Sequence, residues 1–273
     1  MKSFKNRIAV VTGAGSGIGR ATAIALAKEG CDVAVSDINE ASAAETAKFI
    51  EALSRKASVH RIDVSSRQEM EAFPTEVLKT HGKVNIIVNN AGIGIAGSFL
   101  DQSIEDWEKI VGINFWGVVY GCKFFLPHLL KAEEGHIVNI SSLAGLVPGP
   151  GMSSYGATKF AVRGLSEALY SELKKTRVGV TSVHPGMINT NIPKATKFIN
   201  PKDPGAQSRG AKAFERFGHP PEAVAKAIVK AIRSNRPRTI VGVEAKVFDA
   251  IQRAAPEQLI RFSSRLSGQI TGQ

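Results

Sequence analysis

The chain of 273 residues is 43% hydrophobic and 22% charged, an ordinary balance for a globular protein with a buried core, which argues against a disordered chain. Its formal net charge is +11, and its two cysteines, Cys31 and Cys122, fit no disulfide or metal-ligand spacing, so we expect buried thiols, no metal site and a reducing compartment. No segment resembles a signal peptide and no run approaches the ~20 apolar residues of a membrane span, so we expect a soluble, cytoplasmic protein.

The first apolar run, residues 8–12, leads into a glycine-rich turn and then a helical pattern from Arg20. A buried strand, a glycine turn and a helix N-terminus form a site for a pyrophosphate, because free backbone N–H groups and the positive helix end face the anion. The spacing is Thr-Gly-x-x-x-Gly-x-Gly, through Thr12, Gly13, Gly17 and Gly19. We therefore predict a nucleotide-binding turn.

The second apolar run ends at Asp37. An acid at this strand end accepts hydrogen bonds from an adenosine ribose and repels a 2′-phosphate, which favours NAD over NADP. Arg20 lies close enough in sequence to keep NADP open. A structural alternative is that Asp37 caps the helix that starts near Asn39.

Strand and helix patterns then alternate with short connections, which predicts a doubly wound parallel sheet. The next strands end at Asp63-Val64 and at Asn90-Ala91-Gly92. Ligands collect at the carboxyl ends of such strands, so these residues are candidates for nucleotide contacts. Their alternative role is that of simple turn residues.

A long helical segment, residues 103–131, carries Asn114 within its apolar face, where an amide usually satisfies a neighbour. The strand at residues 136–140 then delivers Ser141 and Ser142, and the next helix begins at Ser153. On that helix Tyr155 and Lys159 stand at i and i+4 on one face. An ammonium beside a phenol favours the phenolate, so the pair is suited to proton exchange with an oxygen substrate.

Together these motifs resemble the classical short-chain dehydrogenase/reductase family over roughly residues 5–190. The resemblance rests on Thr12-Gly13-x-x-x-Gly17-x-Gly19, Asp63, Asn89-Asn90-Ala91-Gly92, Asn114, Ser142, Tyr155-x-x-x-Lys159 and Pro185-Gly186-x-x-x-Thr190. It implies a single α/β Rossmann-fold domain with a mostly seven-stranded parallel sheet and helices on both faces. It also implies hydride transfer between a nicotinamide cofactor and an alcohol or ketone.

The resemblance assigns catalytic roles to four residues. Tyr155 would be the acid/base, and Ser142 would bind the same substrate oxygen. Lys159 would hold the nicotinamide ribose and, jointly with the positive charge of the oxidised nicotinamide, lower the pKa of the tyrosine. Asn114 would fix a water that links Lys159 to solvent as a proton relay. The implied cofactor-binding residues are Gly13, Ser16, Gly17, Ile18, Gly19, Asp37, Asp63, Val64, Asn90, Ala91, Gly92, Tyr155, Lys159, Pro185, Gly186, Ile188 and Thr190.

Residues 191–220 are rich in Lys, Pro and Gly with few periodic runs, and we expect a long loop that covers the substrate. We place the catalytic domain at residues 1–243. The expected pocket lining, residues 93–96, 143–152 and Met187, is mostly apolar, which favours a hydrophobic alcohol or ketone of the secondary, long-chain, steroid or retinol type.

The last segment, residues 244–273, reads as an amphipathic extension interrupted near Pro256. It lies in a basic region, since 15 Lys and Arg stand against 6 Asp and Glu between residues 191 and 273. We expect the extension to cover the pocket or pack on the domain or on an interface of a homodimer or homotetramer. The alternatives are that it contacts an anionic membrane peripherally or that it is a frayed end.

Three alternatives to an NAD-dependent dehydrogenase stay open. An NADPH-dependent carbonyl reductase would use the same machinery. A non-catalytic nucleotide sensor is a second alternative, although all four catalytic residues are present. A basic surface that binds nucleic acid is the third, but we expect no nucleic-acid partner.

Overall fold

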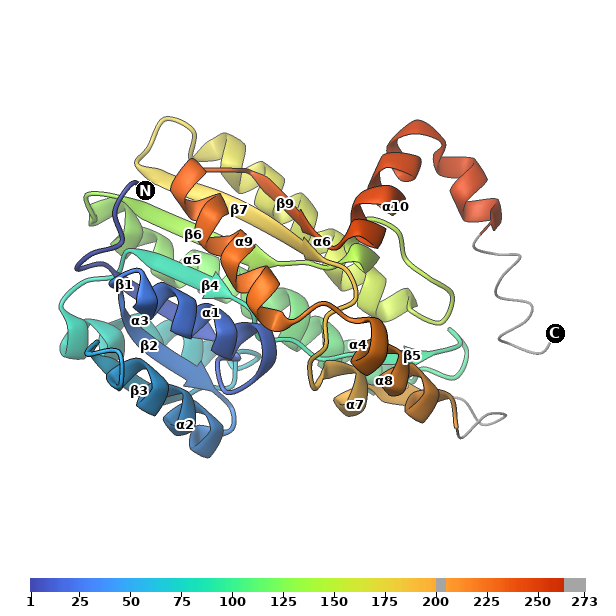
Figure 1. Cartoon of the computed structure of the whole chain (residues 1–273), viewed down its shortest axis with the longest axis horizontal. Coiled ribbons are helices and arrows are strands. Elements are labelled where there is room, and N and C mark those ends of the chain that lie inside the picture. Colours follow the sequence, from blue (N-terminus) through green and yellow to red (C-terminus); the bar gives the residue numbers. More distant parts are fainter. Residues whose placement is uncertain (200–204, 263–273) are drawn as a thin grey trace.

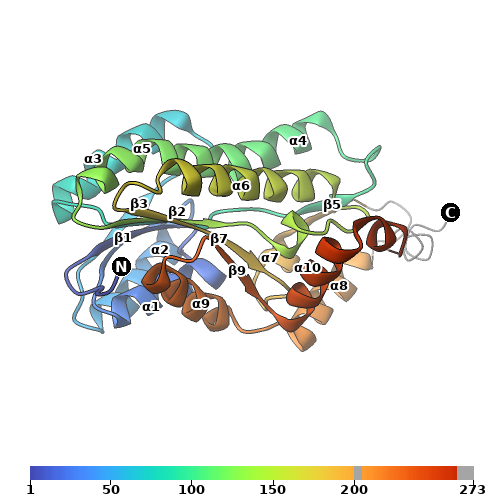
Figure 2. The same ribbon diagram turned by 90° about the horizontal axis from the view of Figure 1, so that it is seen from above.

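The computed structural model describes residues 1–199 and 205–262 and is built around a seven-stranded sheet (Figures 1 and 2). The strand order is β3-β2-β1-β4-β6-β7-β9, and every pairing in this sheet is parallel. The strands are β1 (Ile8–Thr12), β2 (Asp32–Asp37), β3 (Ala57–Arg61), β4 (Ile86–Asn89), β6 (Gly135–Ile140), β7 (Val178–Pro185) and β9 (Arg238–Val241). The predicted doubly wound sheet is confirmed.

Burial explains why these runs form the centre of the sheet. All residues of β1, β4 and β6 are buried, as their runs of Ile and Val require in a sheet covered on both faces. The strand order reverses between β1 and β4, from which the chain winds outward in opposite directions. The crevice at the carboxyl ends of these two strands is therefore the expected ligand site.

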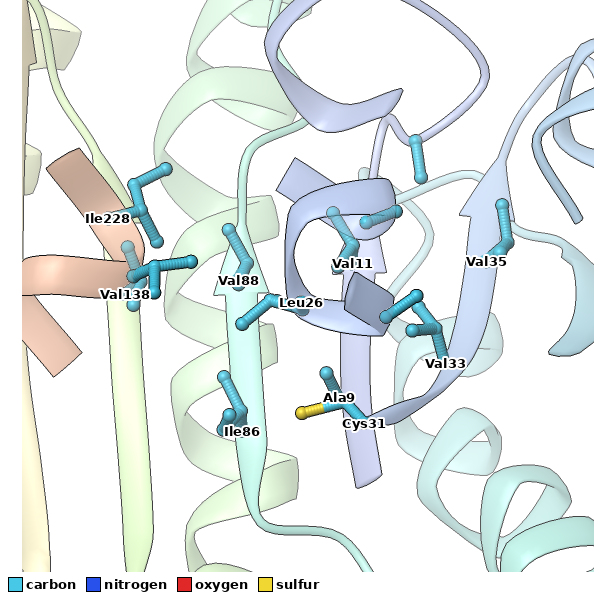
Figure 3. Close-up of a cluster of buried hydrophobic side chains, with 14 of the residues drawn as sticks. Ala9, Val11, Leu26, Cys31, Val33, Val35, Ile86, Val88, Val138 and Ile228 are labelled. Carbon is cyan, nitrogen blue, oxygen red and sulfur yellow. The ribbon is translucent and has the colours of Figure 1, made fainter. Parts of the chain in front are cut away.

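One face of the sheet is covered by α1 (Gly17–Lys28), α2 (Glu40–Glu51) and α9 (Pro221–Ser234) (Figure 2). Their apolar sides belong to one core cluster with the strands. In this cluster Leu26 of α1 and Ile228 of α9 lie over the central strands, near Val88 and Val138 (Figure 3). Each of these four side chains is fully buried.

The opposite face is covered by α3 (Arg67–His81), α5 (Gly117–Lys131) and α6 (Ser153–Glu172), with α4 (Ile104–Val111) at the end of α5 (Figure 2). Phe73 and Phe125 meet edge to face in this second core, with ring centroids 5.4 Å apart. Ser66 and Ser103 cap α3 and α4 by accepting hydrogen bonds from the N–H groups three residues later.

The predicted helix over residues 103–131 is continuous but not uniform. A π-helical turn, Gly112–Trp116, joins α4 to α5 and carries Asn114. The segment Ile104–Lys131 is long and apolar enough to cross a membrane by length and composition. Val118, Phe125 and Leu129 are however buried in the core against the sheet, which is the arrangement of a core helix.

Residues 191–220 differ from the expected loop. They contain α7 (Ile192–Ala195), β8 (Lys197–Ile199) and α8 (Ala206–Phe217), and β8 pairs in parallel with β5 (Ile95–Gly97). Lys197 Nζ also lies 2.7 Å from Asp106 Oδ1 on α4. We call residues 192–199 and 205–217 the cover segment; residues 200–204 of the predicted loop lie outside the described part.

The C-terminal segment forms α10 (Val243–Ala254), and the chain is helical again over residues 256–262. Ala245, Asp249 and Leu259 are buried, whereas Val243 and Val247 are exposed. The break near Pro256 agrees with the sequence. A division between a domain at 1–243 and an extension at 244–273 stays a prediction, and residues 263–273 lie outside the described part.

Two adjacent leucines at the end of α5 provide a test of the core. Leu129 is 0% exposed and Leu130 is 48% exposed. Leu129→Ala should lower the free energy of unfolding by about 2 to 5 kcal/mol, because it leaves a cavity between α5 and the sheet. Leu130→Ala should lower it by less than about 1 kcal/mol. Urea denaturation measures both values, and equal losses would contradict this packing.

Candidate active site

The predicted glycine turn lies at the carboxyl end of β1 and starts α1. Gly13 and Gly17 have φ of +61° and +52°, a backbone region that favours glycine. A side chain at Gly19 would overlap the carbonyl of Gly13. Ser16 is the exposed N-cap residue of α1, and its side chain makes no capping hydrogen bond. The turn thus presents its backbone closely packed at a helix N-terminus, as an anion site requires.

Thr12 joins this turn to the next strand. Its hydroxyl accepts hydrogen bonds from the N–H groups of Asn90 (3.0 Å) and Ala91 (3.1 Å). The Asn90 side chain returns the link by donating to the carbonyl oxygens of Thr12 (2.9 Å) and Gly13 (3.1 Å). The glycine turn and the segment after β4, which lie almost eighty residues apart, are therefore joined by four hydrogen bonds.

Asp37 faces the glycine turn from the end of β2. Its Oδ2 accepts a hydrogen bond from the N–H of Gly15 at 2.9 Å, and its Oδ1 accepts one from the N–H of Asn39. The helix cap is Asn39, whose side chain accepts from the N–H of Ser42. Asp37 is thus not the cap of α2, and it stands at the place where the sequence predicts a ribose contact.

Arg20, the nearby cation that kept NADP open, is already engaged. Its guanidinium donates to Glu45 Oε2, to the carbonyl of Gly15 and to the hydroxyl of Thr46. Arg20 is therefore already paired with the carboxylate of Glu45 at this end of the site.

Asp63 and Val64 follow β3 and take structural roles in the protein alone. Asp63 Oδ1 accepts hydrogen bonds from the N–H and hydroxyl of Ser65, at 2.9 and 2.6 Å, which is a turn geometry. Val64 is 7% exposed, and a side chain on Gly117 would lie 2.9 Å from one of its methyl groups. Neither residue lines the main cavity described below.

Asn114 holds the segment after β4. It is fully buried, its Oδ1 accepts from the N–H of Ile93 at 2.8 Å, and its Nδ2 donates to the carbonyl of Ile93 at 3.0 Å. A side chain on Gly92 would lie 3.1 Å from Asn114 Oδ1 and 3.4 Å from Lys159 Nζ. The π-helical turn therefore brings Asn114, Gly92 and Lys159 to one place, as π-turns often do at functional sites.

The two serines after β6 have different tasks. Ser141 Oγ donates to the carbonyl oxygen of Lys159 at 2.8 Å, so it ties α6 to the strand end. Ser142 starts a short 3₁₀ turn, Leu143–Gly145, and its hydroxyl interacts with Tyr155. Ser141 therefore has a structural contact with α6, whereas Ser142 faces Tyr155 and the catalytic role predicted for it stays a prediction.

Tyr155 and Lys159 lie one helical turn apart, with Lys159 Nζ 5.7 Å from the centroid of the Tyr155 ring. Nζ donates to the carbonyl of Ile140 at 3.0 Å. Burial lowers the pKa of Lys159 from 10.5 to about 8, because the charged form loses its hydration.

Burial governs the pKa of Tyr155 in the protein alone. Burial raises it above its ordinary value, and the hydrogen bond with Ser142 opposes the rise without cancelling it. In the protein alone the effect of desolvation on the Tyr155 pKa therefore exceeds that of the nearby Lys159 ammonium, which donates its hydrogen bond to the carbonyl of Ile140. A lowered pKa needs additional positive charge at the site.

His184 lies on β7 and contacts the main chain of Ser142; the sequence analysis did not single it out. Its Nδ1 lies 3.3 Å from the Ser142 carbonyl oxygen, and its Nε2 lies 2.9 Å from Ser182 Oγ. Burial lowers the pKa of His184 to about 4, so the ring is neutral at neutral pH. Its position on a continuous buried strand gave no sequence signal beyond core packing.

A cavity of about 990 Å³ opens beside these groups. It is lined by Ser142, Tyr155 and Lys159 on one side and by the predicted loop residues Pro185, Gly186, Ile188 and Thr190 on another. Ile18, Asn90 and Gly92 also border it. A side chain on Gly17 would lie 3.2 Å from a Thr190 methyl group, so the glycine turn and the 185–190 loop approach each other.

The walls of the cavity match the expected lining in part. Residues 93–96 and 150–152 line it as predicted, but residues 143–149 and Met187 do not. The cover segment contributes instead, through Phe198, Ile199, Arg209 and Phe214. Gly210 and Phe214 stand one helical turn apart and both line the cavity, whereas Phe217, one turn further on, is 66% exposed. Most of the lining is apolar.

The arrangement is suited to proton transfer at a substrate oxygen. A phenol, a hydroxyl and a buried ammonium converge on an apolar cavity, next to a glycine turn that fits an anion. In residues 1–199 and 205–262 no group of three or more His, Cys, Asp or Glu side chains is placed to hold a metal ion.

Comparison with known proteins gives a consistent result. Residues 7–198 match the family model of the short chain dehydrogenases. The chain is 42% identical over 257 residues to the putative oxidoreductase SadH of Mycobacterium tuberculosis, covering 93% of this chain and 92% of that protein. It is 39% identical over 190 residues to a cyclohexanol dehydrogenase of Acinetobacter, covering 69% and 76%.

Among solved structures, a short-chain dehydrogenase/reductase from Burkholderia phymatum in complex with NAD superimposes with a TM-score of 0.88 at 31% identity, covering 94% of this chain and 96% of that one. The parallel seven-stranded sheet agrees with this structural match. The chain is an oxidoreductase that belongs to the short-chain dehydrogenase/reductase family.

Proposed function

We propose that the protein transfers a hydride between NAD(H) and a hydrophobic alcohol or ketone. The observation that carries this proposal is the convergence of Ser142, Tyr155 and Lys159 on the wall of a largely apolar cavity. The NAD complex of the Burkholderia structure supports the cofactor, and the similarity to the Acinetobacter cyclohexanol dehydrogenase supports the substrate class. We further propose a cytoplasmic location and no nucleic-acid partner.

The residues fit a dinucleotide in several places. The positive-φ glycines leave a backbone cradle between the turn and Thr190, which a larger residue at Gly17 would narrow. Asp37 would accept from the adenosine ribose, while Asn90, Ala91 and Gly92 would border the middle of the molecule. Pro185, Gly186, Ile188 and Thr190 would bind the nicotinamide end, and Asp63 and Val64 the adenine end.

The chain's own groups would manage the proton. During oxidation Tyr155 accepts the proton of the alcohol oxygen, and during reduction it donates a proton to the carbonyl oxygen. The Ser142 hydroxyl donates a hydrogen bond to the same oxygen. The nicotinamide, when bound, supplies the hydride acceptor or donor. Lys159 would hold the ribose and its charge would lower the pKa of Tyr155, and Asn114 would fix the water that links Lys159 to solvent.

Absorbance of NADH formation tests this function directly. The substrates are cyclohexanol, a long-chain secondary alcohol, a primary long-chain alcohol, retinol and a hydroxysteroid, each at mildly alkaline pH with NAD and with NADP. We expect turnover with NAD and at least one hydrophobic alcohol, because the cavity walls are apolar.

Tyr155→Phe is the matched control in this assay. It should lower the turnover at least about a thousandfold, because it removes only the proton-transferring oxygen, and it should leave NADH binding nearly intact. A variant that keeps more than about a tenth of the wild-type rate would remove Tyr155 from this role.

The preference for NAD rests on Asp37. Asp37→Asn keeps an acceptor for the Gly15 N–H but removes the negative charge, so it should shift the ratio of kcat/KM for NAD over NADP toward NADP by about tenfold or more. Asp37→Ala should weaken both cofactors further by loosening the turn. An unchanged ratio in both variants would mean that Asp37 only supports the turn and would reopen the NADPH-dependent reductase.

We also propose that the protein acts as a homo-oligomer. Trp116, Tyr120 and Phe124 form a stacked row along α5, with successive ring centroids 5.7 and 5.9 Å apart, and Trp116 is 46% exposed. Such a row on a helix surface favours contact with a second copy. Trp116→Glu should therefore lower the molar mass in light scattering, whereas Phe49→Glu on α2, also 46% exposed in the wild type, should not. An unchanged mass for Trp116→Glu would exclude this row from the interface.

A further inference from the structure

Glu244, in the first turn of α10, contacts the loop that borders the cavity. Its Oε1 accepts a hydrogen bond from the main-chain N–H of Met187 at 2.9 Å, and its Oε2 lies 3.1 Å from Nε2 of His219. Glu244 lies beyond residue 198, where the family match ends. The sequence analysis assigned it no role.

His219 holds the same loop through its main chain. Its N–H donates to the carbonyl oxygen of Met187 at 2.8 Å, and its carbonyl accepts from the N–H of Asn189 at 2.9 Å. These two bonds form a short parallel bridge between Ile188 and His219. The 185–190 loop is thus paired to residue 219 by backbone bonds, and the Glu244 carboxylate ties both sides of that pairing together.

The carboxylate is packed directly against the loop. A side chain on Gly186 would overlap Glu244 Oε1, and so would one on Gly242, which has a φ of +108°. Gly186 itself borders the cavity. The carboxylate therefore lies directly behind Gly186, which itself borders the cavity. The absence of side chains at Gly186 and Gly242 allows this close approach.

The contacts also keep Glu244 ionised. Burial alone would raise its pKa, but hydrogen bonds from the Met187 main chain, from its own N–H and from His219 outweigh that effect, so that the pKa of Glu244 is lowered. A carboxylate accepts a stronger hydrogen bond from the Met187 N–H than a neutral group would.

We infer that Glu244 is a positioning residue that sets the height and orientation of the 185–190 loop relative to Tyr155 and so controls how the nicotinamide end of the cofactor is held. The inference rests on the proposed function, because it needs this loop to contact the nicotinamide. Loss of the contact between Glu244 and the loop should weaken cofactor binding. It should also allow the nicotinamide ring to present either face to the substrate.

Asp249 provides a matched control on the same helix. It is 8% exposed and accepts a hydrogen bond from Arg238 on β9, so it anchors α10 to the sheet away from the 185–190 loop. Asp249→Ala thus weakens the attachment of α10 without removing the contact with Met187. Glu244→Gln is the conservative variant, since its amide oxygen still accepts from the Met187 N–H.

The experiment compares Glu244→Ala, Glu244→Gln and Asp249→Ala with the wild type. NADH fluorescence titration gives the Kd, and transfer from NADH that carries deuterium on one face of C4 gives the fidelity of hydride transfer. Glu244→Ala should raise the Kd about tenfold and lower the fidelity measurably, the loss expected for one hydrogen bond to the loop. Glu244→Gln should recover most of both, and Asp249→Ala should change the melting temperature but neither readout.

A Glu244→Ala variant that binds NADH like the wild type would overturn the inference, as would an Asp249→Ala variant with the same losses. These failures differ from a failure of the proposed function. If the wild type binds NADH but oxidises no alcohol, the proposed activity fails, and the Kd comparison alone decides the role of Glu244. A wild type that does not bind NADH overturns both.

Discussion

The buried ammonium of Lys159 is the constraint around which the candidate site is arranged. It is 4% exposed, and among the described residues no carboxylate is placed to form an ion pair with it, so a carbonyl oxygen and an aromatic ring are its neighbours. Such burial is unfavourable unless the surroundings hold the group in place. The Ser141 hydroxyl fixes the backbone of Lys159, and the absence of a side chain at Gly92 leaves room beside Nζ. The site therefore holds a cation whose natural partner is an anionic or polar ligand.

Two separate sets of hydrogen bonds hold the segments around Lys159. From one side the glycine turn, Thr12 and Asn90 form a unit fixed by hydrogen bonds at the strand ends. From the other side the π-helical turn clamps Ile93 through Asn114. The cover segment closes the remaining side by pairing β8 with β5, and Lys197 adds an ion pair to Asp106. Parallel strands bring these distant segments to one edge, which explains how residues spread over the chain define a single cavity.

The sequence predicted those parts of the fold that depend on local patterns. The strands, the glycine turn and the i, i+4 pair of Tyr155 and Lys159 follow from periodicity and spacing. The β5–β8 pair did not, because two three-residue strands about a hundred residues apart carry no local signal. The burial that raises the pKa of Tyr155 in the protein alone also carries no local signal, since the extent of burial is a property of the whole fold. The contacts of His184 with Ser142 and of Glu244 with Met187 join residues more than forty positions apart in the chain, so they too carry no local signal.

The supports of the 185–190 loop have a consequence for recombining this protein with its relatives. The stretch that matches the family model ends at residue 198, but the loop is held by His219 and Glu244, which lie beyond it. A chimaera joined near residue 198 would take the loop from one parent and residues 219 and 244 from the other. A crossover placed before Pro185 would instead take the loop, His219, Glu244 and the cover segment from the same parent. The last third of the chain is therefore the part that can be exchanged as a unit.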